Sequence, residues 1–146
     1  MPRNWRAPLQ HTLSRLRAGE FDYHGQPFPW FATDSADHVA LMFANIPLVP
    51  ETVCSLADDD YFAAIDYSGV FTESPRSGFF EYFTYVSDAE YYEREVVPDS
   101  PIVLNAVPPS VRSVYSIYRF SNVLFANDAR LYFDDENWSS FLESVK

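Results

Sequence analysis

Three consecutive aspartates, Asp58, Asp59 and Asp60, form a dense group of side chains that could do chemistry. Carboxylates can ligate a metal ion or transfer a proton. A calcium loop needs oxygen ligands spaced so that the chain wraps the ion, with a glycine at the sharp turn, and no glycine lies close to the triplet. Magnesium would need a distant acid as well, such as Asp66 or Asp134. The pattern therefore favours a charged turn or interaction face, whose neutralisation should leave folding nearly unchanged.

The other residue types that commonly do chemistry have no spacing typical of a catalytic or metal site. The histidines His11, His24 and His38 form no His-x-x-x-His pair, and Cys54 is the single cysteine, so no zinc-binding pattern exists. Cys54 has apolar neighbours and is predicted to be a core residue. A Gly-x-Ser-x-Gly elbow and a glycine-rich phosphate loop are absent, whereas a Ser/His/Asp triad stays open because its members meet only in the fold. We predict no enzyme, no cofactor and no metal.

The net charge of −11 is unevenly distributed along the chain. Residues 1–20 sum to +3, so the remaining residues sum to −14. Such a surplus of acid repels phosphate, which argues against nucleic acid and anionic membranes as partners. A protein with a basic surface is the natural complement, because opposite charges speed encounter. The alternative interpretation is that the negative charge only keeps the protein soluble.

Tyrosines and acids alternate in the stretch between residues 81 and 95. Aromatic anchors inside an acidic rim suit a protein interface against a basic partner, although an edge strand with a solvated face has the same pattern. Together with the aspartates of the triplet, this stretch predicts a partner-binding surface. Its predicted residues are Asp58, Asp59, Asp60, Asp66, Tyr82, Tyr85, Glu90, Tyr91, Tyr92 and Glu93.

The elements that position these residues are predicted from apolar spacing, prolines and glycines. Helical spacing covers residues 8–18, a segment from Glu51 that ends at Gly69, residues 109–119 and residues 135–145. Strand patterns cover a hairpin of 30–34 with 38–43, then 79–86 and 91–97, and a second hairpin of 123–125 with 130–133. The sum is one α+β domain over residues 1–146, a mostly antiparallel sheet with helices at the N-terminus, in the middle and at the C-terminus.

The sequence also predicts the cellular compartment of the protein. No apolar run approaches the roughly 18 residues of a membrane span. The basic N-terminus is followed by no continuous apolar stretch, which does not support a secretory signal. We therefore expect a cytoplasmic protein, and nine arginines to one lysine suggest a GC-rich bacterial genome.

Two passages resemble the immunity proteins of bacterial toxin systems. One is Trp30–Asp34, a tight loop and Val39–Phe43; the other is Tyr91–Val97, followed by prolines and Ile102–Leu104. The resemblance spans residues 28–126. It implies a stoichiometric inhibitor that binds a cognate toxin, for which a nuclease is one candidate. It transfers no functional residue, because immunity proteins bind their toxins through surfaces that differ from case to case.

Two other classes of function stay open at this point. A small enzyme or ligand-binding domain would hold a pocket between the aromatic-rich sheet and a helix, with His24 or His38 among its polar groups. An adaptor subunit of a larger assembly would bind a partner unrelated to any toxin. The sequence favours the toxin-binding protein over both, because the charge is acidic and catalytic motifs are absent.

Overall fold

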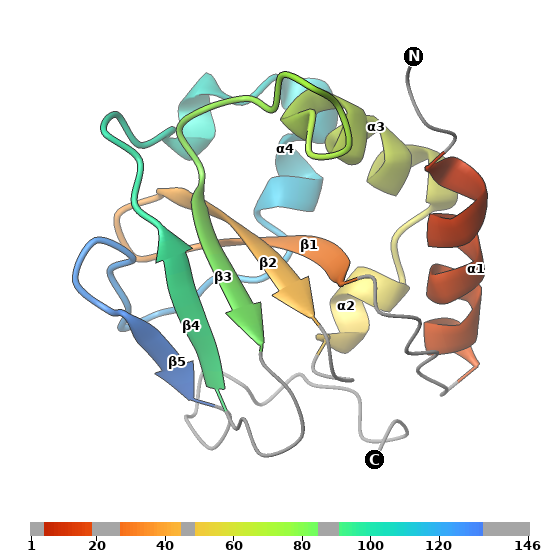
Figure 1. Cartoon of the computed structure of the whole chain (residues 1–146), viewed down its shortest axis with the longest axis horizontal. Helices are drawn as coiled ribbons and strands as arrows, with labels where there is room; N and C mark the ends of the chain where they lie inside the picture. Colours follow the sequence, from red (N-terminus) through yellow and green to blue (C-terminus); the bar gives the residue numbers. More distant parts are fainter. Residues whose placement is uncertain (1–4, 19–26, 45–48, 85–90, 133–146) are drawn as a thin grey trace.

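The computed structural model describes residues 5–18, 27–44, 49–84 and 91–132. Its sheet has five strands in the order β1-β2-β3-β4-β5. The strands are β1 (Phe28–Thr33), β2 (Val39–Ala44), β3 (Phe80–Thr84), β4 (Tyr91–Val96) and β5 (Arg130–Tyr132). The helices are α1 (Arg6–Arg17), α2 (Glu51–Cys54), α3 (Asp58–Ser68), the 3-10 turn η1 (Leu104–Ala106) and α4 (Pro109–Tyr115). In Figure 1 the α-helices lie above and to the right of the sheet, and β5 forms its opposite edge.

The first two strands form the hairpin that the sequence predicts. They pair antiparallel, with Trp30 opposite Met42, and every residue of both strands is buried. Their apolar residues run on without alternation because both faces of this part of the sheet are covered. The connecting turn contains Asp37 with a φ of 62°, a conformation that aspartate tolerates better than most residues.

The remaining pairings confirm an α+β fold with a mostly antiparallel sheet. The β2–β3 pair is parallel, and its crossover carries α2 and α3, whereas β3–β4 and β4–β5 are antiparallel. The predicted second hairpin is wrong, because β5 pairs with β4. Residues 123 and 124 belong to no strand, and a turn over residues 125–127 follows them, which Asp128 closes by accepting a hydrogen bond from the Leu124 amide at 2.8 Å.

The helices follow the predicted pattern with two differences. The segment from Glu51 divides into α2 and α3, and the aspartate triplet forms the first turn of α3, where its charge complements the helix dipole. Gly69 ends α3 in the left-handed conformation. The last helix of the described chain stops at Tyr115, because the chain then pairs with the end of β1 through a hydrogen bond from the Phe120 amide to the Thr33 carbonyl. The predicted helix 135–145 lies outside the described residues.

Aromatic rings fill both faces of the β1–β2 part of the sheet. On one face, the Tyr115 ring of α4 packs on Phe31, with ring centroids 4.2 Å apart. On the other face, the segment 117–128 contributes Tyr118, whose ring lies 6.1 Å from that of Trp30. Cys54 is buried, as predicted for a core residue. No helix among the described residues has the length and apolar character needed to cross a membrane.

Candidate binding surface

The predicted aspartates of α3 divide into paired and exposed groups. Asp58 is tied to α1, because Arg17 lies 2.7 Å from one carboxylate oxygen and Gln10 donates a hydrogen bond of 2.9 Å to the other. Asp59 and Asp60 are exposed on the first turn. The triplet is therefore no single acidic site, since its first member helps to attach one helix to another.

Arg17 has a structural role that reaches beyond this ion pair. Its guanidinium also donates hydrogen bonds to the carbonyl oxygens of Cys54 and Leu56, at 2.9 and 2.5 Å. The side chain thus satisfies the carbonyl group of the last residue of α2 and that of Leu56, two residues beyond the helix. Asp66 is paired too, with Arg6 at 3.3 Å, but both side chains are more than half exposed. An exposed pair of this kind contributes little to stability.

Tyr82 and Tyr92 are buried in the core, so the prediction that they are surface anchors is wrong. Side chains alternate between the two faces of a strand, and both tyrosines point to the face covered by residues 117–128. Their hydroxyls are satisfied there: Tyr82 donates to the Asp128 carbonyl, and Tyr92 accepts a 3.1 Å hydrogen bond from the Trp30 indole. Burial raises the pKa of both hydroxyls. Tyr85 and Glu90 lie outside the described residues.

The opposite face of β3, β4 and β5 holds the remaining predicted residues. Here called the outer sheet face, it consists of Glu81, Phe83, Tyr91, Glu93 and Arg130. The strand register places Phe83 directly opposite Glu93, and Glu93 directly opposite Arg130. All except Arg130 are partly exposed, and Arg130 is exposed. This face therefore brings together two carboxylates and two aromatic rings on neighbouring strands.

An arginine is already held on the outer sheet face. The Arg130 guanidinium lies 4.7 Å from the centre of the Tyr91 ring, and its Nε lies 3.4 Å from the Glu93 carboxylate. A ring and a carboxylate two residues apart on one strand thus hold a cation between them. This arrangement combines cation–π attraction with an ion pair.

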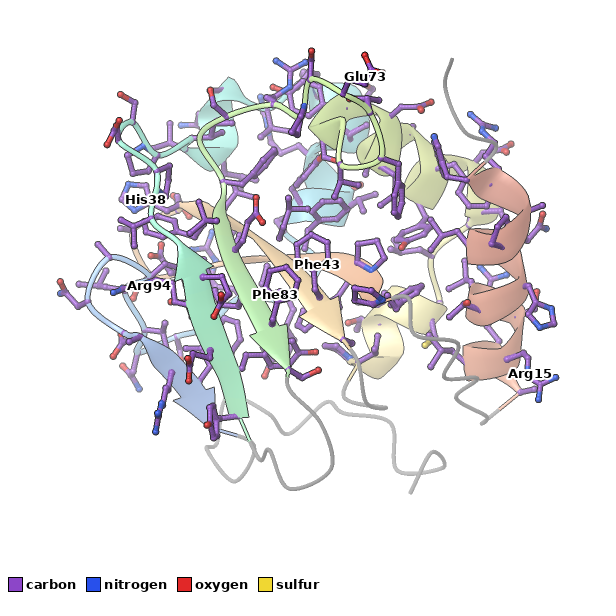
Figure 2. The ribbon with its side chains drawn as sticks, viewed as in Figure 1. Arg15, His38, Phe43, Glu73, Phe83 and Arg94 are labelled. Carbon is purple, nitrogen blue, oxygen red and sulfur yellow. The ribbon has the colours of Figure 1, made fainter. Side chains whose placement is uncertain are left out.

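The other ring and carboxylate of this face lie on β3. The Phe83 ring stacks on Phe43 of β2, with centroids 4.4 Å apart and planes 13° from parallel. Figure 2 shows these two rings side by side in front of β2 and β3. Glu81, two residues before Phe83, has no hydrogen bond or ion pair with any residue that the structure describes. Desolvation of this half-buried carboxyl raises its pKa.

Asp34, the most completely buried carboxylate among the described residues, was not among the predicted site residues. One of its oxygens accepts hydrogen bonds from the Ala36 and His38 amides, at 3.0 and 2.9 Å. The other accepts from the Phe125 amide at 2.8 Å. Asp34 therefore joins the β1–β2 turn to the distant segment 117–128, which is a structural role. The signal that could have indicated the local half of this network is the position of this aspartate at the start of a polar turn.

The positions of the described histidine, cysteine and acidic side chains can be compared with what a metal site requires. Within the described ranges, no three histidine, cysteine or acidic side chains gather as a cation would require. The His38 ring lies 3.8 Å from the Asp34 carboxylate, which is already satisfied by backbone amides. His11 is exposed on α1, and His24 lies outside the described residues.

Compared with known proteins, the chain matches no protein-family model, no curated protein and no solved structure. The resemblance to immunity proteins therefore stays a prediction.

Proposed function

We propose that this chain is a binding protein of the immunity type, which neutralises a bacterial toxin by forming a stoichiometric complex in the cytoplasm of the producing cell. The toxin would present a basic surface, as a nuclease does where it holds phosphates. The proposal makes the acidic, partly aromatic exterior the functional part of the molecule. The buried sheet and helices would serve to keep that exterior in shape.

The distribution of charge is the observation that carries this proposal. Residues 49–84 contain seven acids and one arginine, whereas residues 91–132 contain four of each. The acid surplus of the described chain therefore lies in the stretch from α2 to β3, which includes the exposed Asp59 and Asp60 and the partly exposed Glu81. A local surplus of this kind attracts a basic protein and orients it during encounter.

The packing between sheet and helices favours binding at a surface over chemistry in a pocket. The Phe79 ring stacks against Tyr115 at 5.8 Å, and the Tyr115 hydroxyl donates to the Ala64 carbonyl of α3. The Tyr61 hydroxyl donates in the same way to the Pro29 carbonyl of β1. Side chains of the described residues therefore occupy the space that the ligand-binding alternative assigns to a pocket.

A complex with the product of the neighbouring gene tests the proposed function. We expect a toxin gene beside this one, and a one-to-one complex between this chain and an inactivated form of that toxin. Affinity should fall strongly between about 50 mM and about 500 mM salt, because charge attraction is screened. Calorimetry at both salt concentrations measures this.

Two outcomes would contradict the proposed function. The first is the absence of a complex at low salt, with both proteins folded. The second is turnover of a substrate by the purified chain, which would favour the enzyme alternative. A tight complex with a protein unrelated to any toxin would favour the adaptor alternative instead.

A further inference from the structure

The outer sheet face holds two similar pairs of side chains, of which one contains an arginine. On β4, Tyr91 and Glu93 are two residues apart and hold Arg130 between ring and carboxylate. On β3, Glu81 and Phe83 are also two residues apart and point to the same face. Such a spacing separates the two side chains by about 7 Å, which a planar guanidinium and its stem can bridge.

In the β3 pair, the Glu81 carboxylate has no cation from the described part of the chain. No described residue hydrogen-bonds or ion-pairs with the Glu81 carboxylate, although that carboxylate is half-buried beside an aromatic ring. A carboxylate that has lost part of its water without gaining a partner is unfavourable, and a guanidinium would restore its hydrogen bonds. The acid surplus of residues 49–84, which includes Glu81, attracts that positive charge.

We propose that Glu81 and Phe83 form a binding site for an arginine side chain from a basic protein partner. The guanidinium would donate hydrogen bonds to the Glu81 carboxylate and lie against the exposed part of the Phe83 ring, as Arg130 lies against Tyr91. Glu93, directly opposite Phe83, adds a second negative charge next to the site. The proposal rests on the proposed function for the class of its partner and adds the place and the chemistry of recognition.

A short peptide tests the site without the toxin. The probe is an acetylated and amidated pentapeptide with one arginine between glycines, titrated into the full chain while NMR follows the Glu81 and Phe83 side chains. We expect both to shift, with weak but saturable binding. The same peptide with citrulline, which has the shape of arginine without its charge, should shift neither.

Matched variants then separate this site from general charge attraction. Glu81→Gln should weaken binding of the arginine peptide about tenfold, the loss expected for one charge-assisted hydrogen bond. Glu73→Gln removes the same charge from the loop after α3, away from Phe83 in Figure 2, and should change the affinity less than about twofold. Phe83→Leu keeps an apolar side chain against Phe43 and should weaken binding about threefold, because it removes only the cation–π part.

Three outcomes would overturn the proposal. Equal losses for Glu73→Gln and Glu81→Gln would mean that the peptide responds to net charge alone. Shifts centred on Asp59 and Asp60 would place the arginine on α3. Concentration-dependent shifts of Phe83 without peptide would mean that a second copy of the chain occupies the site. If the toxin complex forms and neither Glu81→Gln nor Phe83→Leu weakens it, the arginine site is wrong and the proposed function stands. If the arginine peptide binds at Glu81 and Phe83 but no toxin complex forms, the arginine site stands and the proposed function is wrong.

Discussion

The two parts of the sheet differ in how their faces are used. In β1 and β2, both faces are covered and all residues are buried. In β3, burial alternates strictly, with Phe80, Tyr82 and Thr84 buried and the residues between them partly exposed. Because the strands belong to one continuous sheet, the difference lies in what packs on it. Helices α3 and α4 cover the first part and leave the outer sheet face of the second part accessible.

This difference separates the structural charges from those available to a partner. The carboxylate next to the covered part, Asp34, is buried and satisfied by three backbone amides. One of the two carboxylates on the outer sheet face, Glu81, is half-buried and satisfied by no described residue. Burial alone does not distinguish a structural acid from a binding acid. The hydrogen-bond partners do.

The largest expected effect comes from Asp34→Ala. This change leaves three backbone amides without an acceptor, of which the Phe125 amide is buried, and disconnects the β1–β2 turn from segment 117–128, so the free energy of unfolding should fall by about 3 kcal/mol or more. Urea unfolding measures the loss. Asp37→Asn is the control, since Asp37 is an exposed residue of the same turn paired with Arg119, and should cost less than about 1 kcal/mol. A loss of similar size for both variants would contradict the distinction.

Alkaline pH should destabilise both parts of the sheet together. Burial raises the pKa of Tyr61 in α3 and Tyr115 in α4, and of Tyr82 in β3 and Tyr92 in β4. These hydroxyls ionise at lower pH in the unfolded chain, so their stabilisation is complete below about pH 10 and is lost as the pH rises further.

Urea unfolding between pH 7 and 11 measures this dependence. Tyr92→Phe should make the decline above pH 10 shallower by up to one proton, and should cost about 1 kcal/mol at pH 7 through its lost hydrogen bond with Trp30. A pH dependence identical to that of the unchanged protein would show that Tyr92 ionises equally easily in the folded chain, which its burial contradicts.

A smaller effect should distinguish the aspartates of the triplet. Asp58→Asn weakens the attachment of α3 to Arg17 and should lower stability by about 1 kcal/mol. Asp59→Asn removes an exposed charge from the same helical turn and should lower stability by less than about 0.5 kcal/mol. For Asp59 we therefore keep the expectation that neutralisation changes the stability very little, and for Asp58 we now expect a measurable loss. Equal losses in thermal unfolding would mean that the helix dipole alone accounts for both.

The smallest expected effect is a gain of stability in Glu81→Gln. Desolvation raises the pKa of Glu81, so its ionisation disfavours the folded state as the pH rises from the ordinary pKa of a glutamate through the raised one. The variant should be more stable than the unchanged protein at pH 7 by a few tenths of a kcal/mol, a difference that disappears below about pH 4. Chemical unfolding at both pH values tests this. Destabilisation at pH 7 would indicate that the carboxylate has a favourable partner.

Local patterns predicted most of the fold. The hairpin of β1 and β2, the strands β3 and β4, the helix α1 and the end of α3 at Gly69 all follow from apolar spacing and turn residues. The false second hairpin also had a local pattern, two apolar runs around a polar turn. The prediction of this hairpin is wrong because the buried Val123 and Phe125 pack against the sheet. Such long-range packing produces no pattern in the neighbouring sequence.

The candidate surface was only partly predictable for the same reason. Alternating tyrosines and acids indicated a two-sided strand, but the sequence does not say which side is covered. Tyr82 and Tyr92 face the core, whereas Tyr91 and Glu93 face outward, because segment 117–128 packs on one side. The sequence places Glu81 in the acidic stretch between residues 81 and 95. It does not indicate that Glu81 has no ion-pair partner among the described residues, because that depends on where arginines from distant segments lie in the fold.

Carboxylate labelling of the toxin complex tests the central claim most directly. A carbodiimide reagent marks accessible acids, and mass spectrometry compares the marks in the free chain with those in the complex. If the partner binds the outer sheet face, labelling of Glu81 and Glu93 should fall about fivefold or more, because interface acids lose contact with solvent. Asp59 and Asp60 should change by less than about twofold. Protection of Asp59 and Asp60, with Glu81 and Glu93 labelled as before, would contradict the account.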